Sequence, residues 1–348
     1  MGRWLAVVCV GCDDPAALMA LREFTGRFGS ATFEILANVF NAVEQQPCAV
    51  RDALRADAAA PSSRLVGVHT VAGFKSVFWR SLAPRLTAPY DFIWLKDADV
   101  LVDPHLFSLR EVEHWMGRTG AAVAQPTILP LDGRSKSHGW WTPFRAAFHA
   151  SCVVQSSPIV EQMTPILTRR AFDELRARLT VVPPELFATD SGDFGLETFW
   201  CGLFADGVSP RAAHATLNSS DAPTASPAAC VVLNHVSVVH QDTKTIRRHA
   251  TRWAAQAARS NTSSTSAGAR AANATGGTGL KNYLIARWPR VMNVSGRADD
   301  VHHRLHRNRC WGIDRPTRNQ TAAATASLTT VRQPANDGGS KNRGAMRA

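Results

Sequence analysis

The sequence has no apolar run that approaches the roughly 20 residues of a membrane-spanning helix. Its first apolar stretch, Trp4–Val10, is too short for a signal-peptide core followed by a cleavage site. No internal repeat is present either. The sequence therefore predicts a soluble chain without a transmembrane segment, and its 348 residues, 45% hydrophobic, suffice for one large domain or two small ones.

Cysteine is sparse, odd in number and scattered, which is not the pattern of a disulfide framework. Several of the seven cysteines lie in apolar runs, so most are expected to be buried thiols. Cys9 and Cys12 have the spacing of a redox motif or half a zinc site. No second such pair completes a zinc site, which favours strand packing for both.

The positive net charge of +11 is not spread evenly. Residues 244–348 contain 19 Lys and Arg against 4 Asp and Glu, and residues 1–243 have a small acidic excess. A basic tail can contact acidic partners or a membrane surface, but no basic groove is indicated in the folded part. We therefore expect no nucleic-acid partner.

Short β-rich runs alternate with helical patterns in residues 1–243, which is typical of βαβ units and a largely parallel sheet. Tyr90–Leu95 is an almost continuous apolar run followed by polar residues, as expected for a buried central strand reaching its carboxyl edge. Open α/β sheets bind ligands at that edge. Other expected strands are Leu5–Val10, Phe33–Phe40, Arg64–His69, Ala121–Pro126, Cys152–Gln155 and Val231–His240, and expected helices are Ala16–Phe28, Phe74–Leu82, Leu106–Met116, Ala171–Leu179 and Phe194–Phe204.

Composition divides the chain into a folded part and a tail. Residues 1–254 are expected to form the domain, and 255–280, rich in Ala, Ser, Thr and Gly, a low-complexity linker. Residues 281–293 contain apolar side chains that fit a docking helix. Residues 294–348 are expected to be a disordered basic tail.

The strongest local signal for chemistry is Asp97-Ala98-Asp99, directly after the apolar strand. Two carboxylates at this spacing can bind a divalent cation, or bind the cation and a ribose together. A diphosphate leaving group needs such a cation, because oxygen ligands hold Mg²⁺ or Mn²⁺ and the metal neutralises the charge on the departing nucleotide. The alternative is a solvated turn.

A wider set of motifs is found at Phe74–Trp79, Tyr90–Asp99, Ala124–Pro126, Val160–Ile166, Phe194–Glu197 and Val238–His240. In their order and spacing these motifs resemble the plant and algal family known as domain of unknown function 707 (DUF707). The resemblance covers residues 5–242, or extends to Met292 at its widest, and implies a GT-A, Rossmann-type fold with a mixed, mainly parallel sheet and a transferase that uses a nucleoside-diphosphate sugar. The family commonly has Glu where Ala98 stands and Asp where Glu197 stands.

The resemblance suggests roles on the donor side. Asp99 would bind the metal, and Asp97 would contact it through water or hold the ribose. His240, at the end of a late strand, would complete the Mn²⁺ or Mg²⁺ site, with a strand-capping histidine as the alternative. His235 is expected to be structural. Lys75 would reach the diphosphate as a point charge, unless it is a solvated surface residue.

On the acceptor side, Glu197 is expected to take a proton from the acceptor hydroxyl, with Asp193 beside it at the helix entrance. In a retaining enzyme Glu197 would instead position the acceptor, and Asp193 alone fits a helix cap. Trp140 and Trp141 lie in a polar loop, where they could stack on sugar or simply pack. The acceptor is an unidentified glycan or small molecule.

Two other functions fit the sequence. In a phosphatase of the haloacid-dehalogenase type, Asp97 would be the nucleophile, although its strand would normally open the domain. A catalytically silent module would keep the fold to bind nucleotide or glycan. The compartment is the Golgi or secretory lumen if an anchor precedes this chain, and the cytoplasm otherwise. Asn-x-Ser/Thr triplets at Asn218, Asn261, Asn273, Asn293 and Asn319 favour the lumen.

Overall fold

The computed structural model describes residues 1–12, 14–30, 32–40, 47–71, 73, 75–130, 152–183, 196–205, 229–241, 287 and 310–313. Side chains are not described at 130, 197, 198, 205 and 310–313. The elements in chain order are β1 (Trp4–Gly11), α1 (Pro15–Phe28), β2 (Phe33–Phe40), α2 (Ala49–Ala59), β3 (Leu65–His69), α3 (Lys75–Ser81), α4 (Pro84–Thr87), β4 (Phe92–Asp97), β5 (Val100–Leu101), α5 (Leu109–Thr119), β6 (Val123–Pro130), β7 (Cys152–Ser156), β8 (Ile166–Thr168), α6 (Arg169–Thr180), α7 (Leu196–Ala205), β9 (Cys230–His240) and β10 (Cys310–Ile313).

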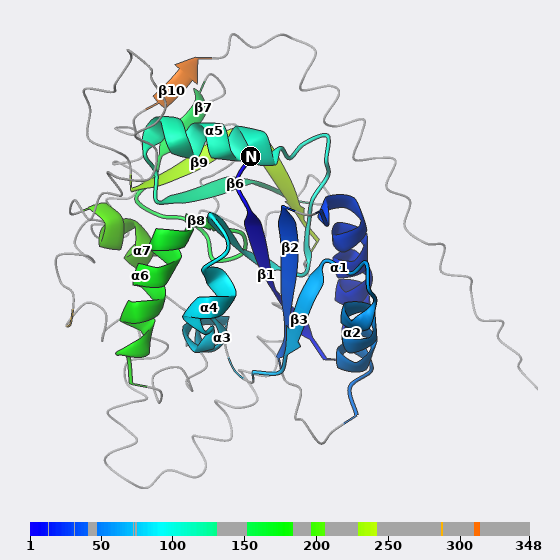
Figure 1. Cartoon of the computed structure of the whole chain (residues 1–348). Helices are drawn as coiled ribbons and strands as arrows, with labels where there is room; N and C mark the ends of the chain where they lie inside the picture. Colours follow the sequence, from blue (N-terminus) through cyan, green and yellow to red (C-terminus); the bar gives the residue numbers. More distant parts are fainter. Residues whose placement is uncertain are drawn as a thin grey trace, which may run out of the picture. The chain divides into compact units, whose positions relative to one another are not determined.

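These strands form one mixed sheet in the order β10-β7-β9-β6-β8-β4-β1-β2-β3, with β5 paired to β9. Strands β3, β2, β1 and β4 are parallel neighbours, as are β6 and β9. The short β8 is antiparallel to both β4 and β6, so β4 and β6 run in the same direction. The expectation of a mainly parallel α/β sheet flanked by helices is confirmed (Figure 1).

Side chains alternate along β1 between two hydrophobic clusters, because successive residues of a strand point to opposite faces. One face packs on α1, α2 and α5, and the other on α3, α6 and α7. In Figure 1, α1 and α2 lie on one side of the β1–β3 sheet region and α3, α4 and α6 on the other. Trp94 of β4 stacks on Phe107 at 4.5 Å between ring centroids. Full burial of a large apolar side chain contributes roughly 1.5–3 kcal/mol, so this packing fixes the strand that carries the acidic motif.

Helix α2 was not predicted from the sequence, because Ala49–Ala59 is rich in Ala, Arg and Asp and has few large apolar side chains. Strand β4 ends two residues later than expected, so that Asp97 is its last residue. Within the proposed tail, Cys310–Ile313 form β10 and pair with β7. The rest of the proposed linker, docking helix and tail lies outside the described residues, apart from Arg287.

The expectation that most cysteines are buried thiols is also wrong. Cys12 is disulfide-bonded to Cys48, and Cys201 to Cys230. Of the Cys9–Cys12 pair, Cys12 forms a disulfide, whereas Cys9 is a buried thiol. Sequence could not show this pairing, because the Cys12–Cys48 bond joins residues 36 positions apart that only the fold brings together. Within the described ranges, no helix is long and apolar enough to cross a membrane.

Candidate functional site

The acidic motif lies where β4 reaches the carboxyl edge of the sheet. Asp97 is the last residue of β4, and Ala98 and Asp99 form a turn that leads into β5. Leu95 and Asp97 are held from one side by Pro165 and Met163, whose backbone carbonyls accept hydrogen bonds from their amides. Asp97 is therefore held in a strand and Asp99 in the turn that follows it. Both lie at the edge where parallel sheets bind ligands.

Asp97 is paired with Lys75, the first residue of α3. The Lys75 ammonium donates to both carboxylate oxygens, at 3.0 and 2.9 Å, and to the Gln162 carbonyl at 3.3 Å. Burial raises the pKa of the Asp97 carboxyl, and the Lys75 charge opposes that shift. The Lys75 and Asp97 side chains are 24% and 22% exposed, so a ligand can reach this ion pair from solvent.

Asp99 is paired with His240, the last residue of β9. The His240 Nε2 lies 3.3 Å from Asp99 Oδ2, and the Gln241 amide donates to the Asp99 carbonyl at 3.0 Å. Val100 of β5 is in register with His240. Although burial alone would raise the pKa of Asp99, hydrogen bonding and charge from His240 lower it. His240 therefore lies beside the acidic motif, and its role as a metal ligand stays a prediction.

Lys96 is a site residue that the sequence interpretation missed. Its side chain lies on the opposite face of β4 from Asp97, with its ammonium over the Phe24 ring at 4.8 Å. The ammonium donates to the Asp97 carbonyl at 2.9 Å. Burial lowers the pKa of Lys96 to about 8, against the opposing charges of Asp99 and Asp97. The sequence signal that could have identified Lys96 is a lysine inside an apolar strand, directly before the acidic motif.

Asn38 of β2 is a second missed residue. Its amide nitrogen donates to the Val71 carbonyl at 3.2 Å, and its amide oxygen accepts from the Val71 amide at 2.9 Å. Asn38 is in register with Cys9, which is in register with Asp97 on the other side of β1. It therefore anchors the chain that leads from β3 to Lys75. The signal was an amide side chain within the run Phe33–Phe40, whose other polar residue is Glu34 near its start.

The segment between β7 and β8 connects this site to α7. Trp94 donates to the Thr164 hydroxyl at 2.9 Å, and Trp200 of α7 donates to the Val160 carbonyl at 3.0 Å. The Glu161 amide donates to the Gln125 side chain at 2.6 Å. These contacts connect Trp200, in the middle of α7, to the segment that supports Asp97.

The structure leaves several predicted residues untested. Asp193, Trp140 and Trp141 lie outside the described residues, as does the side chain of Glu197, whose backbone belongs to α7. His235 is exposed on β9. The described site therefore consists of Lys75, Asp97, Asp99 and His240, with Lys96 and Asn38 supporting it.

This arrangement offers two carboxylates, whose oxygens are the donor atoms that a hard divalent cation prefers, and one imidazole nitrogen. As described, each carboxylate is neutralised by a cationic or hydrogen-bonding partner. In the described part of the chain no group of three or more His, Cys, Asp or Glu side chains is arranged to hold a metal ion. Metal binding here would need the Lys75–Asp97 ion pair to open.

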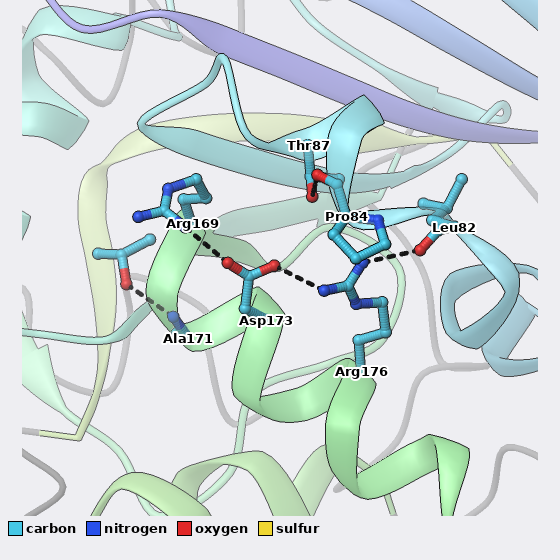
Figure 2. Close-up of polar contacts among 8 residues, drawn as sticks. Leu82, Pro84, Thr87, Arg169, Ala171, Asp173 and Arg176 are labelled. Atoms are coloured by element: carbon cyan, nitrogen blue, oxygen red, sulfur yellow. Dashed lines mark hydrogen bonds and ion pairs between the residues drawn. The ribbon is translucent and has the colours of Figure 1, made fainter.

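A cavity of about 230 Å³ lies at the other end of the strands, away from the acidic motif. Thr168, which lines it, is in register with Phe92 at the start of β4. Figure 2 shows Asp173 between Arg169 and Arg176, at 2.6 and 3.1 Å, with Arg176 also bound to the Leu82 carbonyl. These contacts hold α6 against the segment that follows α3. The polar residues beside the cavity therefore have a structural role in packing α6.

No family model and no curated protein matches the chain. Among solved structures, similarity is found to Staphylococcus aureus TarS 1–349 (11% identity, TM-score 0.40, covering 71% of this chain and 63% of that one). GalNAc-T7 with UDP, GalNAc and Mn²⁺ is similar at 12% identity and a TM-score of 0.43, over 70% of this chain and 44% of that one. The mannosyltransferase PcManGT from Pyrobaculum calidifontis with GDP-Man and Mn²⁺ is similar at 13% identity and a TM-score of 0.40, over 94% of this chain and 79% of that one.

The chain thus spans less than two thirds of the TarS and GalNAc-T7 structures. TM-scores below 0.5 at such low sequence identities assign no function. A functional assignment therefore has to rest on the residues of this chain.

Proposed function

We propose that the chain is a metal-dependent glycosyltransferase that moves a sugar from a nucleoside diphosphate to a hydroxyl group. The observation that carries this proposal is the convergence of Asp97, Asp99, Lys75 and His240 at the carboxyl edge of the sheet. The DUF707-like order of motifs supports it. In the proposed reaction the bond from the sugar C1 to the diphosphate oxygen breaks and a bond from C1 to the acceptor oxygen forms.

The residues present suit Mn²⁺ or Mg²⁺ in kind, because carboxylate oxygens from Asp97 and Asp99 and an imidazole nitrogen from His240 lie at the same edge of the sheet. Asp99 and His240 would bind the cation, and Asp97 would bind it or the ribose. A cation bound there would supply charge neutralisation for the departing nucleoside diphosphate. Lys75 would contribute a further positive charge to the diphosphate.

Glu197 is proposed as the base that takes the acceptor proton, with Asp193 beside it. It is the second residue of α7, and Trp200 of the same helix is bonded to the segment that supports Asp97. Replacement of Glu197 by Gln should abolish transfer and leave donor binding unchanged. If donor binding and transfer fall together, Glu197 acts in binding instead.

The phosphatase alternative is disfavoured, because it places its nucleophile on the strand that opens the domain. Here Asp97 ends the fourth strand, after β1, β2 and β3. The silent binding module predicts nucleotide binding without turnover in any acceptor screen.

We also propose an oxidising compartment, such as the Golgi or secretory lumen. The Cys12–Cys48 and Cys201–Cys230 disulfides support this, because structural disulfides persist in secreted and lumenal proteins and are rare in the cytosol. Glycans at Asn218 of the native protein would support the lumen. Free thiols at Cys12 and Cys48 would contradict it.

The decisive experiment is thermal unfolding with UDP-, GDP- and ADP-sugars, each with and without Mn²⁺. We expect one nucleotide class to raise the unfolding temperature only with Mn²⁺, and Asp99→Asn to lose the shift. Asp57→Asn is the matched control, because Asp57 is also ion-paired but lies on α2, away from the site. If no nucleotide stabilises the wild type, the proposed function is wrong.

A further inference from the structure

The Lys75 ammonium donates hydrogen bonds to both carboxylate oxygens of Asp97. A divalent cation bound to Asp97 would need the same oxygens. We propose that Lys75 exchanges partners: it neutralises Asp97 in the empty site, and moves to the donor diphosphate when a divalent cation takes Asp97. This rests on the proposed function and adds a coupling between cation and donor binding.

Competition follows from the geometry. A cation bound to a carboxylate lies about 2.0–2.6 Å from its oxygens. The Lys75 nitrogen is already within 3.0 Å of both Asp97 oxygens, so the two positive charges would be neighbours in a half-buried site. Like charges at that separation repel strongly where water is partly excluded. Cation binding at Asp97 therefore displaces the ammonium.

Lys75 is able to move because its side chain is partly exposed, and its hydrogen bond to the Gln162 carbonyl is long at 3.3 Å. Lys96 is the useful contrast. It is 2% exposed and sits between the Phe24 ring and the Asp97 carbonyl. Among the described residues, Lys75 is therefore the exchangeable ammonium of the site and Lys96 the fixed one.

The exchange makes cation and diphosphate binding interdependent. Without nucleotide, the cation must displace Lys75 without compensation, which weakens cation binding. With a diphosphate present, the displaced ammonium gains a new anionic partner. Thermodynamic linkage requires the cation to strengthen nucleotide binding by the same factor.

The test measures the affinity for MnCl₂ with and without UDP or GDP, by calorimetry and by electron paramagnetic resonance of free Mn²⁺. In Lys75→Met, Mn²⁺ alone should bind about tenfold more tightly, because the competitor is gone. UDP or GDP should bind about tenfold more weakly at saturating Mn²⁺, and the mutual enhancement should shrink. Lys75→Gln provides a second neutral variant if Lys75→Met does not fold.

Lys75→Arg should retain the competition, because it keeps the charge. Arg22→Met is the matched control, because Arg22 pairs with Asp57 through two hydrogen bonds away from the site. It should leave both affinities unchanged.

The two proposals fail in different ways. If the wild type binds a nucleotide with Mn²⁺ but the neutral Lys75 variants bind Mn²⁺ equally or more weakly, the exchange is overturned and the donor site stands. If the wild type binds neither UDP nor GDP nor any other nucleotide of the panel, both proposals are wrong.

Discussion

His240 Nε2 lies 3.3 Å from Asp99 Oδ2, which joins the last residue of β9 to the turn that follows β4. The neighbouring Gln241 amide donates to the Asp99 carbonyl, so the end of β9 contacts Asp99 through both its backbone and a side chain. The acidic motif is therefore completed by a strand that lies far along the sequence.

If His240 is a metal ligand, His240→Ala should weaken Mn²⁺ binding at least about tenfold. His235→Ala is the matched control on the same strand, because His235 is exposed. Calorimetric titration with MnCl₂ measures both. A rise in Mn²⁺ affinity in His240→Ala would instead mean that His240 only neutralises Asp99.

Asn38→Ala should lower both the stability and the nucleotide affinity, because it removes both partners of the Val71 backbone. Leaving these groups unpaired should lower the free energy of unfolding by roughly 1–3 kcal/mol, measured in urea. Asn234→Ala is the control, since Asn234 also binds a backbone carbonyl, that of Cys152. Equal loss of nucleotide affinity in both variants would contradict a positioning role for Asn38.

Removal of the Cys12–Cys48 disulfide by a double Cys→Ser replacement should lower the free energy of unfolding by roughly 2–4 kcal/mol. The bond joins residues 36 positions apart, so it closes a long loop and restricts the unfolded chain. Chemical unfolding measures the loss, and peptide mapping without reduction should recover Cys12 linked to Cys48. Recovery of both as free thiols in the native protein would refute the bond.

Stability should also fall in acid through His69, whose pKa is lowered by burial. Between the ordinary histidine pKa of about 6.5 and its lower folded value, the unfolded chain binds more protons than the folded protein. The free energy of unfolding therefore decreases as pH falls through this window and recovers as pH rises. His69→Gln should remove this part of the pH dependence, whereas His105→Gln, at an exposed position, should keep it.

The sequence located much of the fold, because strands and amphipathic helices carry local periodic patterns. Phe33–Phe40 and the placement of the acidic motif at a strand end were predicted directly. The antiparallel insertion of β8 between β4 and β6 was not, because the register between distant segments leaves no local pattern.

The sequence by itself determined the acidic residues, the strand that carries them and the candidate cationic partners. Only the tertiary structure decided that Lys75 binds both oxygens of Asp97, that Asn38 holds the Val71 backbone, and that Cys12 pairs with Cys48. The reason is physical: periodicity is set by neighbours along the chain, whereas ion pairs, buried amides and disulfides depend on side chains that meet only after the sheet has assembled.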